Sequence, residues 1–163
     1  MGIEKSDWMQ AWVNLIHAGT YLRQGLERAF REELGISLSE QDLLKQLSVN
    51  DGVLMLSELG DRIYFSKAGI TRMLDRLEKR GLVRRQEVPG NRRSLSAVLT
   101  PAGRKTFEQS REILSVYVEK SLYDKLDDEE IISLKNNLTS LLKAHGVFDG
   151  QQRHLKGEKQ NKP

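Results

Sequence analysis

The sequence contains no cysteine and only three histidines among its 163 residues. The lack of cysteine excludes disulfide bonds, thiolate metal sites and a cysteine-based redox switch. With so few histidines we expect neither a dedicated transition-metal sensor nor a cofactor, although a site built from carboxylates and a histidine stays open.

Long apolar runs are missing as well. No run approaches the roughly 20 residues that are needed to span a bilayer, and the N-terminal MGIEKSDWMQ lacks the apolar region of a signal peptide. We therefore expect a cytoplasmic protein with no membrane partner. Its apolar content of 38% and charged content of 30% are typical of a soluble, helix-rich single domain over residues 1–163.

Catalytic motifs are also absent from the sequence. The chain has no cysteine nucleophile, no glycine-rich phosphate loop and no pair of histidines at metal-binding spacing. The acidic run at residues 127–130 is explained as the cap and first turn of a helix. We therefore expect a protein that is not an enzyme.

Positive charge is present, and it is concentrated in one segment. Between Arg62 and Arg93 there are ten Lys and Arg residues against three Asp and Glu, a local excess of +7. The rest of the chain carries sixteen against twenty, so the overall charge of +3 conceals a strongly basic module. Such clustering is typical of a nucleic-acid-binding surface.

Apolar spacing and capping residues predict four helices in the first half of the chain. We expect them at residues 6–33, from residue 39, at 57–63 and at 66–80, with Gly81 ending the fourth. Each begins at a serine that can cap it, and the SEQD that starts at Ser39 has the form of a capping box.

A β-hairpin is expected next, with arms at residues 82–86 and 95–99 around a Pro-Gly turn. Val53-Leu54-Met55 is a further β-prone run. Thr100-Pro101 then starts a fifth helix, and a capping box at Asp127 starts a sixth that Gly146 ends. The polar residues 149–163 are expected to form a disordered tail. The predicted fold class is mainly α with a small β-hairpin wing, a winged helix-turn-helix over residues 39–100.

The helix predicted at residues 66–80 is amphipathic. Ile70, Met73, Leu74 and Leu77 recur at helical spacing and form one buried stripe. The opposite face carries small and polar residues beside cations, which can approach base edges and phosphates in a major groove. Its candidate DNA-binding residues are Ser66, Lys67, Thr71, Arg72 and Arg76. The alternative is a solvated helix face, but the position between a short helix and a hairpin favours DNA binding.

The tip of the predicted hairpin holds Arg92 and Arg93 beside the turn. A two-stranded ribbon can hold an arginine at minor-groove depth, where narrow A·T-rich DNA attracts cations. Either arginine alone could belong to a solvated loop, whereas the pair at the tip of a wing favours DNA contact.

The segments LSELGDRI, SKAGITRMLDRLEKRGLVRR, NRRS and LTPAGRK resemble the multiple antibiotic resistance regulator (MarR) family of bacterial transcription factors. The resemblance covers residues 8–146. It implies a homodimer whose first, fifth and sixth helices, here residues 6–38 and 101–146, form the dimer core. It further implies two winged helix modules that bind a pseudo-palindromic operator, with repression as the commoner mode of action.

The wing departs from the family pattern at Asn91, where an aspartate usually precedes the two arginines. The resemblance therefore implies that the aspartate–arginine salt bridge that braces the wing is lost or replaced, leaving a looser wing. It also matches Asp75 to the aspartate of the family's recognition helix. Pairing of Asp75 with Arg93 is our alternative to DNA contact by Arg93.

The apolar pattern of the terminal helices indicates a dimer independently of the family. These helices carry more apolar face than one winged module can cover. A two-fold dimer also places two recognition helices about one DNA turn apart. The alternative is a monomer in which the terminal helices form an intramolecular cap.

Regulators that this chain resembles commonly bind small aromatic or phenolic anions in a crevice between the dimer core and the DNA-binding lobe. The candidate lining residues are Trp8, Trp12, His17 and Tyr117. Such residues are also typical of a core or a dimer interface, and this alternative stays open. The predicted function is a sequence-specific DNA-binding repressor released by a small aromatic ligand. The alternative is a ligand-independent winged helix module that binds DNA or another protein.

Overall fold

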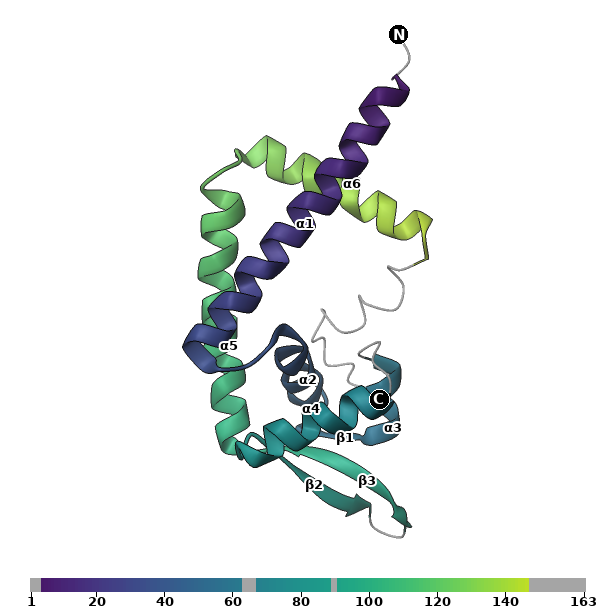
Figure 1. Cartoon of the computed structure of the whole chain (residues 1–163), viewed down its shortest axis with the longest axis vertical. Coiled ribbons are helices and arrows are strands. Elements are labelled where there is room, and N and C mark those ends of the chain that lie inside the picture. Colours follow the sequence, from purple (N-terminus) through teal and green to yellow (C-terminus); the bar gives the residue numbers. More distant parts are fainter. Residues whose placement is uncertain (1–3, 63–66, 89–90, 147–163) are drawn as a thin grey trace, which may run out of the picture.

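A computed structural model describes residues 4–62, 67–88 and 91–146 of the chain (Figure 1). The chain is mainly helical and carries a three-stranded antiparallel sheet, which confirms the predicted fold class. The elements are α1 (Lys5–Leu34), α2 (Leu38–Ser48), β1 (Val53–Met55), α3 (Leu56–Arg62), α4 (Lys67–Lys79), β2 (Val83–Val88), β3 (Asn91–Leu99), α5 (Pro101–Val118), the π-helical η1 (Glu119–Tyr123) and α6 (Asp128–Ala144).

The helix α1 begins earlier than predicted, so the assignment of Ser6 as its N-cap is wrong. Glu4 is the N-cap, and its backbone N–H donates to the Asp7 carboxylate over 3.2 Å. The helix ends at Gly35, whose φ of +64° is a left-handed conformation that glycine adopts without a steric penalty. α3 likewise includes Ser57, which was expected to cap it.

The start of α2 was also misplaced, by two residues. Ser37 rather than Ser39 is the N-cap: its hydroxyl accepts from the N–H of Glu40, and the Glu40 carboxylate accepts from the N–H of Ser37. The sequence SLSEQD offers a capping box in both frames. The earlier frame brings Leu38 into the helix, where it packs against the core.

The sheet has the strand order β1-β3-β2, so the β-prone run at residues 53–55 becomes its third strand. Both arms of the hairpin are longer than predicted, because β2 extends to Val88 and β3 starts at Asn91. After the sheet, the Thr100 hydroxyl accepts from the N–H of Gly103 and Pro101 occupies the first turn of α5, as expected from the sequence.

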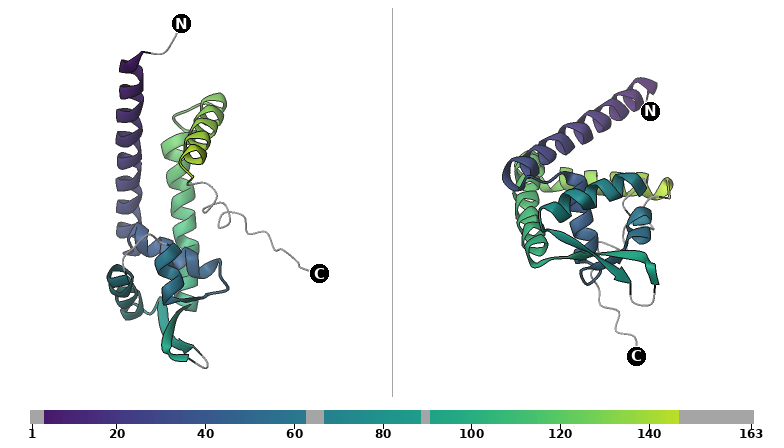
Figure 2. Two further views of the ribbon diagram at one scale, coloured as in Figure 1. Left: turned by 90° about the vertical axis from the view of Figure 1, so that its right-hand side faces the viewer. Right: turned by 60° about the horizontal axis from the view of Figure 1, so that its bottom comes forward.

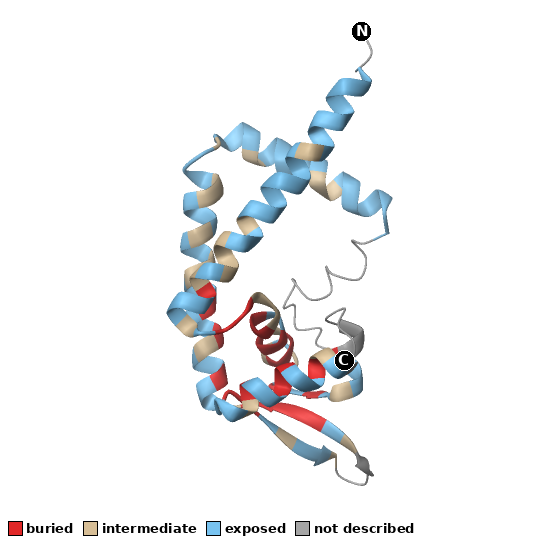
Figure 3. Ribbon diagram, viewed as in Figure 1, coloured by how far each residue is buried: buried red, intermediate tan, exposed pale blue. Residues whose placement is uncertain are grey.

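The buried core lies in one part of the molecule, formed by α2, α3, α4 and the sheet, which we call the lobe (Figure 3). The C-terminal end of α1 and the first turns of α5 close this core with Phe30 and Phe107. The core side chains of the helices that are fully buried are Phe30, Leu43, Leu44, Leu47, Leu59, Leu74 and Leu77. The lobe therefore has an interior of its own.

Residues 5–21 of α1 and residues 116–144, from the end of α5 to α6, project from the lobe, and we call them the arms. Figure 2 shows α1 as a long rod whose N-terminal half extends well beyond the lobe. Large apolar side chains are exposed on both arms, among them Trp8, Met9, Trp12, Leu15, Ile16, Val116, Tyr123, Ile132, Leu134, Leu141 and Leu142. None of the helices in the described ranges is both long and apolar enough to cross a membrane.

Candidate nucleic-acid interface

The helix α4 has the two faces that its sequence predicts. Ile70, Met73, Leu74 and Leu77 are between 0% and 3% exposed and anchor the helix on the core. The opposite face, which carries the polar and cationic residues, is exposed to solvent. The rigid interior thus fixes how α4 presents its basic face, with the β2–β3 hairpin beside it (Figure 1).

The structure places some of the predicted DNA-binding residues and leaves others undescribed. Thr71, Arg72 and Arg76 lie on the exposed face of α4. Lys67 begins this helix and Arg92 and Arg93 lie in β3, but their side chains are outside the described part of the structure. Ser66 falls outside the described residues altogether.

Arg72 is an exposed arginine of α4 that lies opposite its buried stripe. Its side chain is exposed, and it makes no hydrogen bond or ion pair with any residue that the structure describes. An arginine on a recognition helix can donate two parallel hydrogen bonds to the acceptors of a guanine. Arg72 therefore has the geometry and the free donors for direct base reading.

Arg76 is already engaged with the interior of the protein. Its Nε donates to Glu40 Oε1 at 2.7 Å, and the Glu40 side chain is only 6% exposed. Burial alone raises the pKa of Glu40, but the hydrogen bonds from the Ser37 backbone and from Arg76 outweigh it and hold the pKa below the ordinary value. Arg76 thus joins α4 to the start of α2, with the rest of its guanidinium facing solvent.

Sequence reasoning missed Arg85, which braces the wing. Arg85 projects from β2 and donates to the carboxylates of Asp75 and Glu78 on α4, each at 2.6 Å. A third hydrogen bond of 3.2 Å reaches the backbone oxygen of Thr71. Burial tends to lower the pKa of Arg85, yet the two carboxylates together raise it above its ordinary value.

This ion-pair network changes the interpretation of the wing. The resemblance implied that the usual salt bridge is lost or replaced, and Arg85 supplies ion pairs that tie the base of β2 to α4. The looser wing expected from Asn91 stays a prediction, because the side chain of Asn91 lies outside the described part of the structure. Asp75 is paired with Arg85. Whether Arg93 also pairs with Asp75 depends on a side chain outside the described residues. Strand alternation was a signal for Arg85, because it shares the inward face of β2 with Val83.

A second arginine at the end of α4 holds the junction between α1 and α2. The Arg80 guanidinium donates to the backbone oxygens of Gly35 at 2.6 Å and Leu34 at 2.7 Å. These oxygens belong to the end of α1, where helical carbonyls lack partners within the helix. The helix α4 is therefore joined to α2 through Arg76 and, through Arg80 just beyond its last residue, to the end of α1.

The predicted ligand-binding residues do not form one cluster. Trp8 and Trp12 are 60% and 61% exposed near the start of α1, and His17 is also exposed. Tyr117 lies elsewhere, at a cavity of about 420 Å³ between α1, α5 and the start of α2. The other lining residues are mostly apolar, among them Leu22, Leu26, Leu38 and Leu114, with Arg23 as the cation.

A basic helix on a rigid core, with a braced two-stranded wing beside it, defines a winged helix DNA-binding protein. The model of the MarR family matches residues 36–95. The chain is also 31% identical over 112 residues, 69% of each chain, to the Bacillus subtilis protein described as uncharacterized HTH-type transcriptional regulator YfiV. The chain belongs to the MarR family of transcriptional regulators, which bind DNA and are not enzymes.

Solved structures share the fold. The DNA complex of Sco3205, a MarR family regulator of Streptomyces coelicolor, has a TM-score of 0.73 at 22% identity and covers 88% of this chain and 91% of its own. AbsC of the same organism has a TM-score of 0.73 at 24% identity, covering 88% and 97%. The organohalide-sensing regulator RdhR-CbdbA1625, bound to 2,4-dichlorophenol, has a TM-score of 0.71 at 21% identity, covering 88% and 86%.

Proposed function

We propose that this DNA-binding regulator is a cytoplasmic homodimeric repressor, released from a pseudo-palindromic operator by a small aromatic ligand. The observation that carries the DNA-reading part is the exposed basic face of α4, on which no described residue occupies the guanidinium of Arg72. Ser66, Lys67, Thr71, Arg72 and Arg76 read the major groove, and Arg92 and Arg93 reach the minor groove from the wing. The likeness to Sco3205, whose structure was solved with DNA, supports this docking mode.

The exposed apolar side chains of the arms support the homodimer. Trp12 is 61% exposed on α1 and Ile132 is 52% exposed on α6. A soluble protein seldom leaves so many large apolar side chains in water unless another surface covers them. A second copy of the chain covers both arms at once and sets two α4 helices on one face of the duplex.

The apolar cavity beside Tyr117 supports release by a ligand. Its volume of about 420 Å³ suits a single aromatic ring with substituents, and Arg23 at its wall can pair with an acidic group of the ligand. The related fold of RdhR-CbdbA1625 holds 2,4-dichlorophenol. A ligand that binds the dimer better when its α4 helices are wrongly spaced lowers operator affinity by that difference in affinity.

Fluorescence polarisation on duplexes from the upstream region of the protein's own gene tests the DNA-reading part. We expect affinity to fall steeply with salt, because phosphate contacts release counterions. Arg72→Ala should weaken binding by about 1–3 kcal/mol and relax sequence preference. The matched control is Arg111→Ala, an exposed arginine of α5 away from α4. Equal affinity and preference for Arg72→Ala and the parent protein would contradict our placement of the reading face.

Thermal-shift measurements with salicylate and 2,4-dichlorophenol test the ligand part. Binding to the folded protein should raise its melting temperature and weaken operator binding in parallel. Replacement of Leu114 by Trp should fill the cavity beside Tyr117 and remove both effects. A ligand response that survives Leu114→Trp would place the aromatic site elsewhere, such as beside Trp8, Trp12 or His17.

A further inference from the structure

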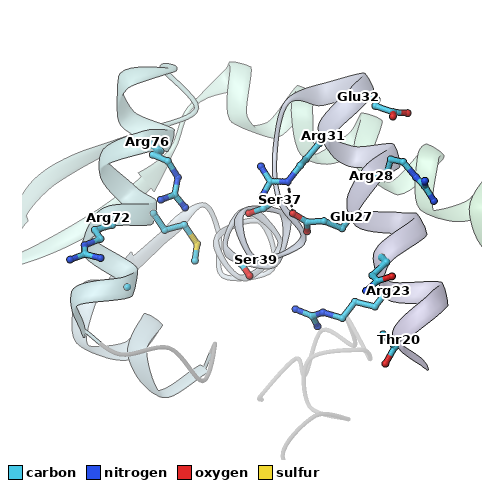
Figure 4. Close-up of a pocket in the computed structure, with 13 residues that line it drawn as sticks. Thr20, Arg23, Glu27, Arg28, Arg31, Glu32, Ser37, Ser39, Arg72 and Arg76 are labelled. Carbon is cyan, nitrogen blue, oxygen red and sulfur yellow. Dashed lines mark hydrogen bonds and ion pairs between the residues drawn. The ribbon is translucent and has the colours of Figure 1, made fainter. Parts of the chain in front are cut away.

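A second cavity, different in chemistry from the one at Tyr117, lies between α1, the start of α2 and α4 (Figure 4). Its volume is about 930 Å³. Five arginines line it against two glutamates, and Glu40, which pairs with Arg76, is a third, so these groups carry a net formal charge of +2. The arginines are Arg23, Arg28 and Arg31 of α1 and Arg72 and Arg76 of α4.

We propose that this cavity binds a small multivalent oxyanion, a polycarboxylate or a phosphate-bearing molecule, and that the bound anion lowers the affinity of the regulator for its operator. The site is distinct from the apolar cavity, because the two share Arg23 and no other lining residue. Binding of the anion does not depend on the proposed function, whereas its effect on the operator does.

The arrangement of the arginines favours an anion of more than one charge. Arg23 extends into the gap beneath α2, and Arg31 and Arg76 approach the start of α2 from opposite sides (Figure 4). Like charges so placed repel one another unless an anion lies between them. A ligand with two or more acidic groups can contact both walls at once, which a monovalent ion cannot.

The arginines also have donors to spare. Arg28 makes no hydrogen bond or ion pair within the described ranges. Arg31 uses its Nε for Glu27 at 2.6 Å and Arg76 uses its Nε for Glu40 at 2.7 Å, which leaves the terminal nitrogens of both unoccupied by described residues. Guanidinium groups in this state match carboxylate and phosphate oxygens with paired hydrogen bonds.

The contacts around the cavity connect it to the DNA-reading face. The Glu27 carboxylate that holds Arg31 also accepts from the N–H of Leu38 at 2.8 Å, at the first turn of α2. Two residues further along α2, Glu40 holds Arg76, and its other carboxylate oxygen accepts from the N–H of Ser37. A path of hydrogen bonds therefore runs from α1 to the start of α2, through the backbone of residues 37–40 and on to α4. Arg72 lies at the edge of the cavity, on the exposed face of α4 (Figure 4).

An oxyanion in the cavity acts on this path in two ways. Its hydrogen bonds with the terminal nitrogens of Arg31 and Arg76 draw these side chains away from Glu27 and Glu40, which changes how α4 is held. It also places negative charge beside Arg72, where DNA phosphates must approach. Both effects weaken operator binding, so anion and operator exclude one another by the same factor in either direction.

Isothermal titration of the full-length, DNA-free protein with citrate and with pyrophosphate, at constant ionic strength, tests the site directly. We expect one of the two to bind, and the choice between them separates a carboxylate from a phosphate ligand. Arg31→Ala should weaken binding about tenfold or more, Arg31→Lys less, and the control Arg111→Ala not at all. Failure of both anions to bind, or equal binding by Arg31→Ala, would overturn the proposal.

Operator binding with and without the bound anion tests the coupling and a competing source of phosphate. The anion should weaken duplex binding by the parent protein about fivefold or more and by Arg31→Ala much less. If Arg31→Ala instead weakens duplex binding in the absence of any small anion as strongly as Arg72→Ala does, the cavity holds DNA backbone phosphate and the proposal is wrong. A protein that binds the anions but no duplex would contradict only the proposed operator function.

Discussion

The lobe and the arms use the same kinds of residue for different purposes. In α4 the apolar stripe is fully covered by the core, whereas no residue of α6 or η1 is buried and α1 buries only Phe30 within the described chain. The lobe thus closes its own interior. The arms keep their apolar side chains available, which is the surface that a second subunit requires.

Leu74 and Leu141 differ in burial although both belong to the apolar face of a helix. Leu74 of α4 is 0% exposed and Leu141 of α6 is 43% exposed, although both belong to apolar stripes at helical spacing. Periodicity therefore predicts which face of a helix is apolar, but it does not reveal whether the same chain covers that face. The stability of the lobe and that of the arms should respond differently to mutation.

The largest expected effect is the loss of Leu74. Leu74→Ala should lower the free energy of unfolding by about 2–5 kcal/mol at every protein concentration, because it leaves a cavity in the closed core. Leu141→Ala should lower stability by an amount that depends on protein concentration, since this side chain contributes to the proposed dimer and not to the core of the lobe. Urea denaturation at several concentrations checks both, and similar concentration-independent losses would contradict the division into lobe and arms.

The next effect concerns the assembly of the arms. Trp12→Ala removes a large apolar side chain that is 61% exposed in the single chain, and it should weaken the proposed dimer by about 2 kcal/mol. Sedimentation equilibrium measures this dissociation constant, with Lys135→Ala on α6 as an exposed polar control. A parent protein that stays monomeric at all concentrations would favour an intramolecular role for the arms.

A smaller effect is expected from the brace between the lobe and its wing. Arg85→Ala removes two ion pairs of partly exposed groups and should cost about 1 kcal/mol of stability. Hydrogen exchange should increase in β2 and β3, and operator affinity should fall. Arg84→Ala is the matched control, because the Arg84 side chain is exposed and, among the residues that the structure describes, bonds only to Gln86. Equal exchange in the two variants would show that the sheet alone fixes the wing.

The smallest effect is a dependence of stability on pH that arises from Glu40. The folded protein holds the pKa of Glu40 below its ordinary value of 4.5, so its carboxylate contributes stability that is complete above that pH. The contribution is lost as the pH falls through the folded pKa. Glu40→Gln should therefore be less stable at neutral pH and should approach the parent protein in acid. If the difference in stability between Glu40→Gln and the parent protein did not change with pH, the effect would come from the packing of the side chain and not from its charge.

The sequence predicted the order of elements because most of the signals were local. The stripe of α4, the Thr100-Pro101 start of α5 and the Asp127 capping box of α6 each depend on residues within one or two turns. The N-cap of α2 was misplaced because two overlapping capping boxes are equally good locally, and tertiary packing of Leu38 decides between them.

The site was less predictable than the fold, because its ion pairs join residues that are distant in sequence. Arg76 had the pattern of a DNA contact, yet its partner Glu40 lies in another helix. Because the N-cap was assigned to Ser39, Glu40 was not recognised as the acidic residue of the capping box. Arg85 belongs to a pair of arginines of which only one faces inward, and only the register of the sheet shows which.

The crossing of α1 and α5 has a mechanical consequence. The Tyr117 hydroxyl donates to the backbone oxygen of Leu22 at 2.9 Å and occupies the space that a side chain at Gly25 would need. This close contact is a point about which the helix α1 can tilt as a rigid body. At 1.5 Å per residue, Trp12 lies about 20 Å from Gly25 on one side and Arg31 about 9 Å on the other. A tilt of α1 about this point therefore moves its arm about twice as far as the end that holds α2. In the proposed dimer, a displacement of the second subunit at the arm would reach α2 and α4 at about half its size.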